Sequence, residues 1–321
     1  MSARDVFLVL VAFAGMFIGS LLPQWAETLA PFPRLMLMCM LFLGFLAVGT
    51  EALRTVMRSR LGMVIRLTAI RLILLPVLCF IAFRFIVPEF ALAAFLIGSS
   101  PVGVMAGMFS LMVHADTALI LVANITTSLL LPLALPIMLF AVSTAVDFLH
   151  LGPMNLPAHL SLGGMTVSLC VTILVPFVLA NLTRAKLPRL TGIILDCRYP
   201  FTIMNIGFTN VAIFSQYGEL LHQNPALIPS ALTAALALSI LMTVAALPTA
   251  RRMEPRQGLA FVICYGTINN ILIMILSMEF FTITEALVAA AYLVPVYMLL
   301  LYYRHYARKV GIQDHEPPMR P

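Results

Sequence analysis

The chain has 321 residues, of which 62% are hydrophobic and 10% are charged, and its mean hydropathy is +1.04. A soluble globular chain is about 45–50% apolar and about 25% charged. The composition therefore excludes a soluble domain and indicates a polytopic α-helical membrane protein. The net charge of +6 comes largely from basic residues that follow the ends of apolar stretches, so we expect a lipid bilayer, and no nucleic acid, as the partner.

Ten apolar stretches are long enough to cross a bilayer, which takes about 20 residues. The first is interpreted as a retained helix, because no small-residue cleavage site of a signal peptide follows it. A connector at 146–158, with Pro153 and Pro157, separates the fifth stretch from the sixth. The predicted spans cover about 5–23, 34–53, 61–86, 90–113, 117–144, 160–183, 191–215, 226–247, 257–279 and 283–303.

Basic residues are concentrated in the connections after the second, sixth, eighth and tenth spans. These alternate connections lie on one side of the membrane, and cytoplasmic loops are enriched in Lys and Arg. We therefore predict a multi-pass protein of the cell inner (plasma) membrane with both termini in the cytoplasm. The residues are Arg54, Arg58, Arg60, Arg184, Lys186, Arg189, Arg251, Arg252, Arg256, Arg304, Arg308 and Lys309.

The fourth span is interrupted by the segment 98–107, which contains two serines, a proline and three glycines. Pro101 removes a backbone donor, and the glycines loosen the helix on both sides. In hydrocarbon, freed backbone groups are tolerated only where they are buried in protein or line a wet cavity. The segment predicts a discontinuous helix at a substrate site. A simple proline kink is the alternative.

The ninth span carries a second polar interruption, at 264–270, in the corresponding place five spans later. A proline kink alone does not predict this second break, whereas inverted repeats of a secondary transporter do. We predict an all-α fold of ten transmembrane helices, with broken helices four and nine crossing in a core domain. The first inverted repeat would cover 1–145 and the second 159–303, followed by a cytoplasmic tail at 304–321.

The half-helices at 104–113 and 271–278 would begin at the two breaks. Their unpaired N–H groups and positive dipole ends would favour an anionic ligand near the midplane. Asparagines in these spans indicate a hydrated or tightly networked centre, because a buried amide needs several partners; a Ser or Thr can instead bond to its own helix. The candidate substrate-binding residues are Ser99, Ser100, Gly103, Val104, Asn124, Asn205, Thr267, Asn269 and Asn270.

Arg71 lies well inside the third span. An arginine at that depth is costly unless it is paired or faces a wet cavity; snorkelling to the interface is the alternative. The six histidines of the chain lie in connections or the tail, away from any Ser or Cys nucleophile. The sequence therefore predicts no catalytic site, no enzyme activity and no cofactor.

Spans two to ten resemble the bile acid:sodium symporter family, most clearly in the fourth, fifth and ninth spans. The resemblance implies a panel domain and a core domain in which the broken helices cross. It also implies sodium-coupled import of an organic anion by alternating access. The motifs that carry it are Pro101-x-Gly103, Asp116-x-Ala118-Leu119, Thr126-Thr127-Ser128-Leu129-Leu130-x-Pro132-x-x-x-Pro136, and Gly266-x-x-Asn269, which matches part of the family's glutamate-x-glycine-x-glutamine-asparagine signature.

The chain departs from sodium-coupled members at most positions that supply side-chain ligands to sodium. A hard cation needs several oxygen ligands, and the residues present here supply few. Cys264 replaces a glutamate, Ile268 a glutamine, Ala106-Gly107 a serine–asparagine pair, Ile120 and Asn124 a serine and a threonine, and Arg71 a glutamine.

Our hypothesis is that Arg71 replaces the bound cation and that Cys264 marks the lost counter-charge. The guanidinium would lie where one sodium ion sits in relatives and would neutralise the anionic substrate or hold the crossing carbonyls together. Transport of the small organic anion would then be independent of sodium, as in a uniporter, an exchanger or a proton-coupled carrier. Two alternatives remain open. One is a sodium-coupled symporter that uses backbone and hydroxyl oxygens, and the other is a non-transporting membrane sensor. The sequence does not indicate the oligomeric state.

Overall fold

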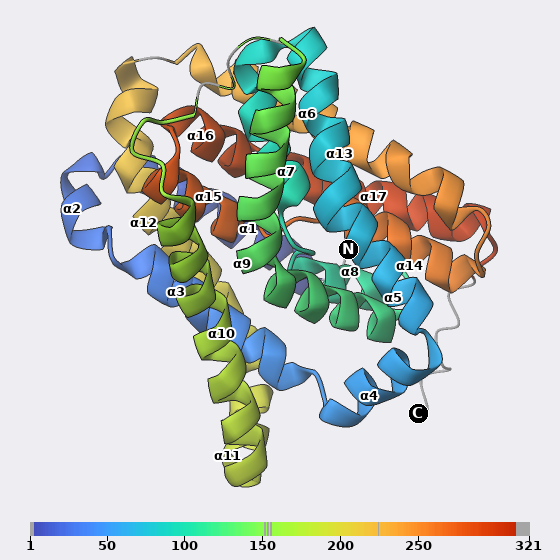
Figure 1. The fold of residues 1–321 in the computed structure, drawn as a ribbon. Helices are drawn as coiled ribbons and strands as arrows, with labels where there is room; N and C mark the ends of the chain where they lie inside the picture. Colours follow the sequence, from blue (N-terminus) through green and yellow to red (C-terminus); the bar gives the residue numbers. More distant parts are fainter. Residues whose placement is uncertain (1–2, 151, 153, 155, 224, 313–321) are drawn as a thin grey trace.

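The computed structural model describes residues 3–150, 152, 154, 156–223 and 225–312, which form helices without any strand (Figure 1). The helices up to the connector are α1 (Ala3–Ser20), α2 (Ala26–Leu29), α3 (Phe32–Ala47), α4 (Thr50–Ser59), α5 (Leu61–Ala69), α6 (Leu75–Ile86), α7 (Ala91–Ser99), α8 (Met105–Met112) and α9 (Thr117–Phe148). After the connector come α10 (Leu162–Lys186), α11 (Pro188–Asp196), α12 (Arg198–Gln223), α13 (Leu227–Ala250), α14 (Pro255–Gly266), α15 (Asn270–Phe280), α16 (Ile283–Ala291) and α17 (Leu293–Lys309).

Each predicted span contains at least one of these helices, which confirms a multi-pass, all-α membrane protein. Within the described ranges, five continuous helical stretches are long and apolar enough to cross a membrane. A sixth crossing results if Leu10–Ser20 and Pro23–Leu29, which are bent by 86°, count as one span. The other spans are shorter, interrupted or less apolar. The five stretches are Leu61–Ile86, Thr117–Phe148, Leu162–Lys186, Leu227–Ala250 and Ile283–Lys309.

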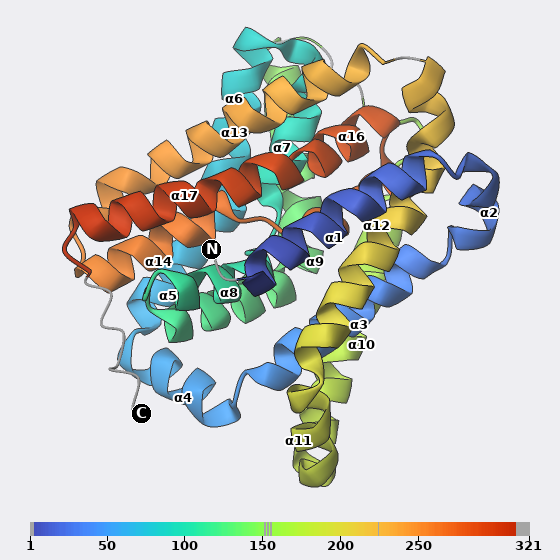
Figure 2. The ribbon, with the colours of Figure 1, turned by 180° about the vertical axis from the view of Figure 1, so that it is seen from behind.

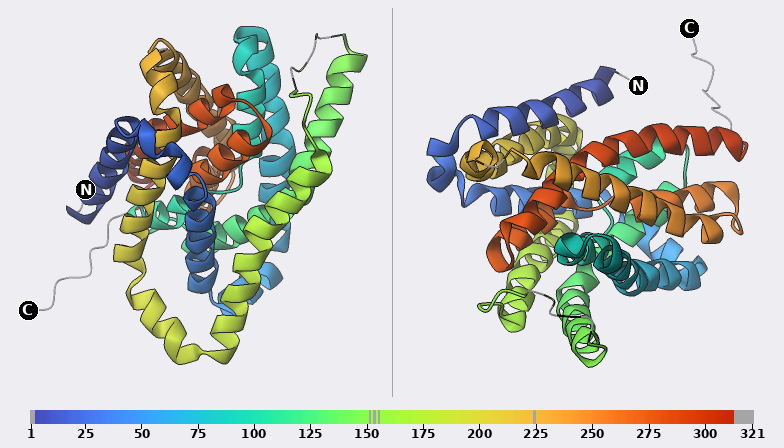
Figure 3. Two further views of the ribbon diagram at one scale, coloured as in Figure 1. Left: turned by 90° about the vertical axis from the view of Figure 1, so that its left-hand side faces the viewer. Right: turned by 90° about the horizontal axis from the view of Figure 1, so that it is seen from above.

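The helices form two groups that pack mainly within themselves. Helices α1, α3, α10, α11 and α12 make up the smaller group, called here the panel bundle. Helices α5–α9 and α13–α17 make up the core bundle. Packing of α10 on α9 and of α3 on α15 joins the two bundles. Figures 2 and 3 show the α10–α11–α12 part of the panel projecting beyond the core.

Helices α1 and α12 approach so closely that only glycine fits at their contact. A Cβ atom on Gly15 would lie 2.6 Å from the carbonyl oxygen of Gly207, and one on Gly19 would lie 2.6 Å from that of Val211. Small residues four apart let membrane helices pack backbone to backbone, where van der Waals contact replaces the hydrophobic effect. This close contact holds α1 against α12 within the panel bundle.

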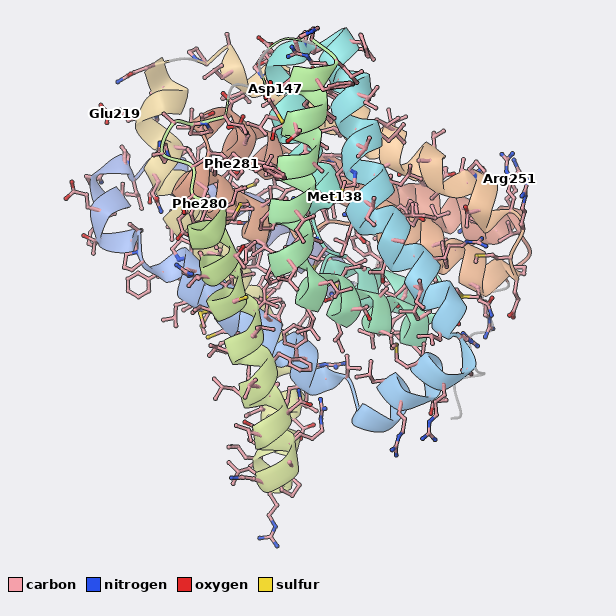
Figure 4. All side chains as sticks on the ribbon, viewed as in Figure 1. Met138, Asp147, Glu219, Arg251, Phe280 and Phe281 are labelled. Atoms are coloured by element: carbon pink, nitrogen blue, oxygen red, sulfur yellow. The ribbon has the colours of Figure 1, made fainter. Side chains whose placement is uncertain are left out.

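The ends of α12 and α13 lie on opposite sides of the molecule. Glu219 lies near the end of α12 and Arg251 directly follows the end of α13. Figure 4 shows these two residues on opposite sides of the molecule.

Candidate functional site

The two broken helices meet at their breaks. The chain leaves α7 after Ser99 and enters α8 at Met105, and it leaves α14 after Gly266 and enters α15 at Asn270. Val102 and Ile268 form an antiparallel β-bridge between the two breaks. The extended segments thus cross in the core bundle, as the sequence predicts, and the breaks replace part of their lost helical hydrogen bonds by bonding each other.

Three hydrogen bonds hold this crossing together. The Gly103 amide donates to the Thr267 carbonyl at 3.3 Å, and the Asn269 amide donates to the Pro101 carbonyl at 3.2 Å. The Asn269 amide also lies 3.0 Å from the Ser100 hydroxyl oxygen. A Cβ atom on Gly103 would overlap the Ile268 carbonyl oxygen. The crossing distance therefore requires glycine at position 103.

Helix α9 supports the crossing from one side. The Val102 amide donates to the Thr127 hydroxyl oxygen at 3.2 Å. The same hydroxyl donates to the Ala123 carbonyl, at 2.7 Å, within α9. The break leaves the buried Val102 amide without a helical acceptor, and the Thr127 hydroxyl oxygen takes the place of that acceptor.

Arg71 lies at the other side of the crossing and is fully buried, with 0% of its surface exposed. It sits in a π-helical turn, Ile70–Leu74, that joins α5 to α6. Its Nε donates to the Ser100 carbonyl at 2.8 Å, and its Nη1 donates to the Tyr265 carbonyl at 2.9 Å. Its Nη2 has no hydrogen-bond partner within the protein. The side chain does not snorkel to the interface.

The two carbonyls that Arg71 binds belong to the C-terminal ends of α7 and α14. Helix C-termini carry unsatisfied carbonyls and partial negative charge, so a cation placed between two of them is stabilised by both. The guanidinium links one broken helix to the other with a fixed positive charge. Cys264, one residue before Tyr265, is also fully buried and carries a free thiol.

The N-terminal ends of α8 and α15 meet at a cavity of about 60 Å³ between the panel and core bundles. The side-chain amide oxygen of Asn269 caps α15 by accepting from the Leu272 amide at 3.3 Å, while its Nδ2, which is buried, has no partner. Two helix N-termini and a free amide donor suit an anionic group. The cavity is lined by Leu37, Met40, Val104, Met105, Ile206, Asn210, Ile268, Asn269, Asn270, Ile271, Leu293, Val296 and Tyr297.

Of the predicted substrate-binding residues, Val104, Asn269 and Asn270 line this cavity, and Ser100 and Gly103 form the crossing beside it. The Ser99 hydroxyl donates to the Phe95 carbonyl and the Thr267 hydroxyl to the Ile263 carbonyl, each within its own helix. These two side chains support the backbone of the breaks, and their contact with substrate stays a prediction.

Two predicted asparagines lie outside the cavity lining. Asn205 donates to the Met36 carbonyl at 3.1 Å and thereby joins α12 to α3 in the panel bundle. Asn124 accepts from the Ser128 hydroxyl at 3.4 Å on α9. Their roles as substrate contacts also stay predictions.

The sequence did not reveal those apolar residues of the cavity that come from α3, α12 and α17. Leu37, Ile206 and Val296 look like any lipid-facing or packed residue along the chain. The sequence predicts no metal ligand, and the positions of the family's sodium ligands are compared here by residue type. Among the described residues, no three His, Cys, Asp or Glu side chains lie close enough to hold a metal ion.

Comparison with known protein families gives one match. A family model described as "Sodium Bile acid symporter family" matches residues 34–224, more than half of the chain. The matched region includes Arg71 and the first break. No curated protein matches the chain. Because this model matches more than half of its length, the chain belongs to the sodium bile acid symporter family. The members of this family are transporters.

Proposed function

We propose that this protein is a secondary transporter that carries a small organic anion by alternating access, with its side-chain sodium sites lost and Arg71 in place of the cation. The observation that carries this proposal is the pair of hydrogen bonds from Arg71 to the Ser100 and Tyr265 carbonyls, one on each broken helix. We place the protein in the cell inner (plasma) membrane with both termini in the cytoplasm, because the basic connections alternate.

The charge balance at the crossing supports sodium independence. The converging C-termini of α7 and α14 favour a cation, and the Arg71 guanidinium already supplies one. Sodium would need several oxygen ligands around it. At the position where sodium-coupled relatives have a glutamate, this chain has Cys264, whose side chain is a thiol. We infer that a sodium ion there would face a buried positive charge without a carboxylate to compensate it.

The chemistry of the cavity supports an organic anion as the substrate. Its polar lining comes from the N-termini of α8 and α15 and from the side chains of Asn210, Asn269 and Asn270. Its walls are aliphatic and aromatic side chains from both bundles, such as Leu37 and Tyr297. A ligand with a compact anionic end and an apolar body fits both parts. The inverted repeats at 1–145 and 159–303 are part of the same proposal.

The alternative of a sodium-coupled symporter depends on backbone and hydroxyl oxygens at the crossing. Several of these oxygens already accept hydrogen bonds: the Ser100 carbonyl from Arg71, and the hydroxyls of Ser100 and Thr127 from backbone amides. Because these oxygens already accept hydrogen bonds, they are poorly available to sodium, which favours a transporter that does not depend on sodium. A sensor would bind the anion in the same way but would not transport it, so uptake measurements separate the sensor from a carrier.

The test measures thermal stability of the purified protein with bile salts and small keto and hydroxy acids, in sodium and again in choline at equal ionic strength. A ligand that binds only the folded state raises the melting temperature. We expect an anion to raise it equally in both cations, and the same anion to enter proteoliposomes in either cation. A requirement for sodium would overturn the proposal. Binding without uptake would indicate a sensor.

Two variants of Arg71 sharpen this test. Arg71→Lys keeps a positive charge but loses the second donor nitrogen, whereas Arg71→Gln restores the residue type of sodium-coupled relatives and removes the charge. We expect Arg71→Gln to lose uptake in choline and Arg71→Lys to retain part of it. Unchanged sodium-independent uptake by Arg71→Gln would contradict the role of Arg71.

A further inference from the structure

Asn210 is the polar side chain that the panel bundle contributes to the lining of the cavity of about 60 Å³. It lies on α12 and is buried, with 1% of its surface exposed. The other panel residues of the lining, Leu37, Met40 and Ile206, are apolar. The helix N-termini that suit an anion belong to the core bundle, so Asn210 faces them from the opposite side of the cavity.

A backbone carbonyl of α1 determines the orientation of the Asn210 amide. The Nδ2 atom of Asn210 donates to the Ala12 carbonyl at 3.0 Å. A carbonyl oxygen can only accept hydrogen bonds, so the amide atom that faces it has to be the nitrogen. The Oδ1 atom therefore lies on the other side of the amide, away from the Ala12 carbonyl.

This Oδ1 atom is available to a ligand. No donor from the described residues bonds to it, and it is not one of their buried side-chain atoms without a partner, so it borders accessible space. The space that Asn210 lines is the cavity. An amide oxygen at such a place needs a donor, because covering it without a hydrogen bond is costly.

Asn205, five residues earlier on the same helix, provides a comparison. It is also 1% exposed, and its Nδ2 likewise donates to a backbone carbonyl of a neighbouring helix, that of Met36. Its Oδ1, however, accepts from the Thr209 hydroxyl at 3.3 Å, and it does not line the cavity. Both asparagines therefore join helices of the panel bundle, but it is Asn210, at the cavity, whose acceptor is left over.

The other polar groups of the lining do not duplicate this acceptor. The first N–H groups of α8 and α15 are donors, and the Asn269 Oδ1 already accepts from the Leu272 amide. In the orientation that satisfies both atoms of its amide, Asn270 accepts from the Leu293 amide. The Tyr297 hydroxyl can donate or accept, so it does not discriminate between ligands. The cavity thus has donors on the core side and an acceptor on the panel side.

We propose that Asn210 selects an anion that carries a hydroxyl group on its apolar body. This inference rests on the proposed function. The anionic end faces the N-termini of α8 and α15, and the hydroxyl donates to the Asn210 Oδ1. An ammonium group could also donate, but a positive charge is disfavoured beside two helix N-termini. One ligand thereby bonds both bundles.

The same geometry disfavours close analogues of the hydroxy anion. A keto oxygen in the place of the hydroxyl would meet another acceptor, and an unsubstituted carbon would leave the Oδ1 without a partner. A site that hydrogen-bonds a substrate hydroxyl rejects the analogue that lacks it far more strongly than an apolar pocket rejects an extra methylene group.

The experiment compares the affinity of the purified protein for three sets of carboxylates, near neutral pH, where all are ionised. Each set contains a hydroxy, a keto and an unsubstituted anion of one skeleton: lactate, pyruvate and propionate; mandelate, phenylglyoxylate and phenylacetate; β-hydroxybutyrate, acetoacetate and butyrate. Affinity is obtained from the dependence of the melting temperature on ligand concentration. In at least one set, we expect the hydroxy anion to bind about 10-fold to 100-fold more tightly than both partners.

Asn210→Leu, which has the same branching but no acceptor, is then measured with the same set. Its affinity for the hydroxy anion should fall to that for the unsubstituted anion, whose own affinity should stay level or rise. A purely structural role of the Ala12 bond would instead weaken all three anions alike. Thr209→Val, which removes a buried hydroxyl of α12 outside the cavity lining, is the control and should keep the preference for the hydroxy anion.

Two results would overturn the inference while leaving the proposed function intact. One is binding of carboxylates without a preference for the hydroxy anion in any set, which needs no variant to observe. The other is a preference that Asn210→Leu retains. Absence of binding by every anion of the three sets would count against the proposed function itself, and against this inference with it.

Discussion

Arg34, in the first turn of α3, and Glu279, in the last turn of α15, form an ion pair with 3.6 Å between Nη1 and Oε1. Arg34 belongs to the panel bundle and Glu279 to the core bundle. Ser168 of α10 joins them, because its hydroxyl donates to Glu279 at 2.8 Å and lies 2.9 Å from Arg34 Nη2. The pair and Ser168 therefore connect the two bundles.

Cross-linking this pair should arrest transport. If the bundles move against each other, Arg34 and Glu279 must separate once in each cycle. The double variant Arg34→Cys/Glu279→Cys, treated with a short bifunctional methanethiosulfonate, should lose anion uptake, and a reductant should restore it. Each single cysteine variant serves as the control. Undiminished uptake by the cross-linked protein would show that the bundles do not separate here.

The exposed ion pair itself should contribute little to stability. Both side chains are 36% exposed, and exposed pairs contribute about 0–1 kcal/mol. Glu279→Gln should therefore change the melting temperature only slightly while changing the uptake rate. A large loss of folded protein would assign the pair a structural role.

Gly103→Ala should destabilise the protein strongly. Its Cβ would overlap the Ile268 carbonyl, so the two breaks would have to move apart; overpacking of this kind costs about 1–3 kcal/mol. Gly44→Ala in α3 is the matched control, since its Cβ meets no atom within 4 Å and alanine favours a helix by about 0.5–1 kcal/mol. Melting in detergent should fall for Gly103→Ala and stay level or rise for Gly44→Ala.

Thr127 and Thr126 offer a second matched pair. Thr127→Val would leave the buried Val102 amide without its acceptor, which costs about 1–3 kcal/mol. The Thr126 hydroxyl donates to the Val122 carbonyl in its own helix, so Thr126→Val should change stability far less. Equal melting temperatures for the two variants would contradict support of the crossing by α9.

Asn269→Ser should separate capping from ligand binding. Serine is as good an N-cap as asparagine, so α15 should keep its stability. The free amide donor is lost, and a hydrogen bond to a charged group contributes about 1.5–3 kcal/mol. We expect the anion to bind about 10-fold to 100-fold more weakly, measured by its effect on the melting temperature. Binding unchanged in Asn269→Ser would remove Asn269 from the site.

The sequence predicted the two breaks because proline, glycine and polar residues in the middle of an apolar span disfavour a continuous helix there. It also indicated that Arg71 is paired or faces a wet cavity, with snorkelling to the interface as the alternative that the structure rules out. The resemblance allowed carbonyls of the crossing as partners of Arg71, but the sequence could not single out those of Ser100 and Tyr265, because backbone carbonyls carry no side-chain signal. Asn205 shows the same limit: its polarity predicts burial, whereas only the packed structure shows that its partner is the Met36 carbonyl in the panel bundle.

The attachment of Arg71 to the chain determines how much charge a transport cycle moves. A co-transported ion crosses with the substrate and leaves, whereas a guanidinium bound to both broken helices stays in the protein. Each cycle of a uniporter would then carry the charge of the anion alone, and each elementary charge is worth about 2.3 kcal/mol per 100 mV. With a membrane potential that is negative inside, this energy opposes import of the anion by a uniporter and favours its export, whereas exchange for an anion of equal charge moves no net charge.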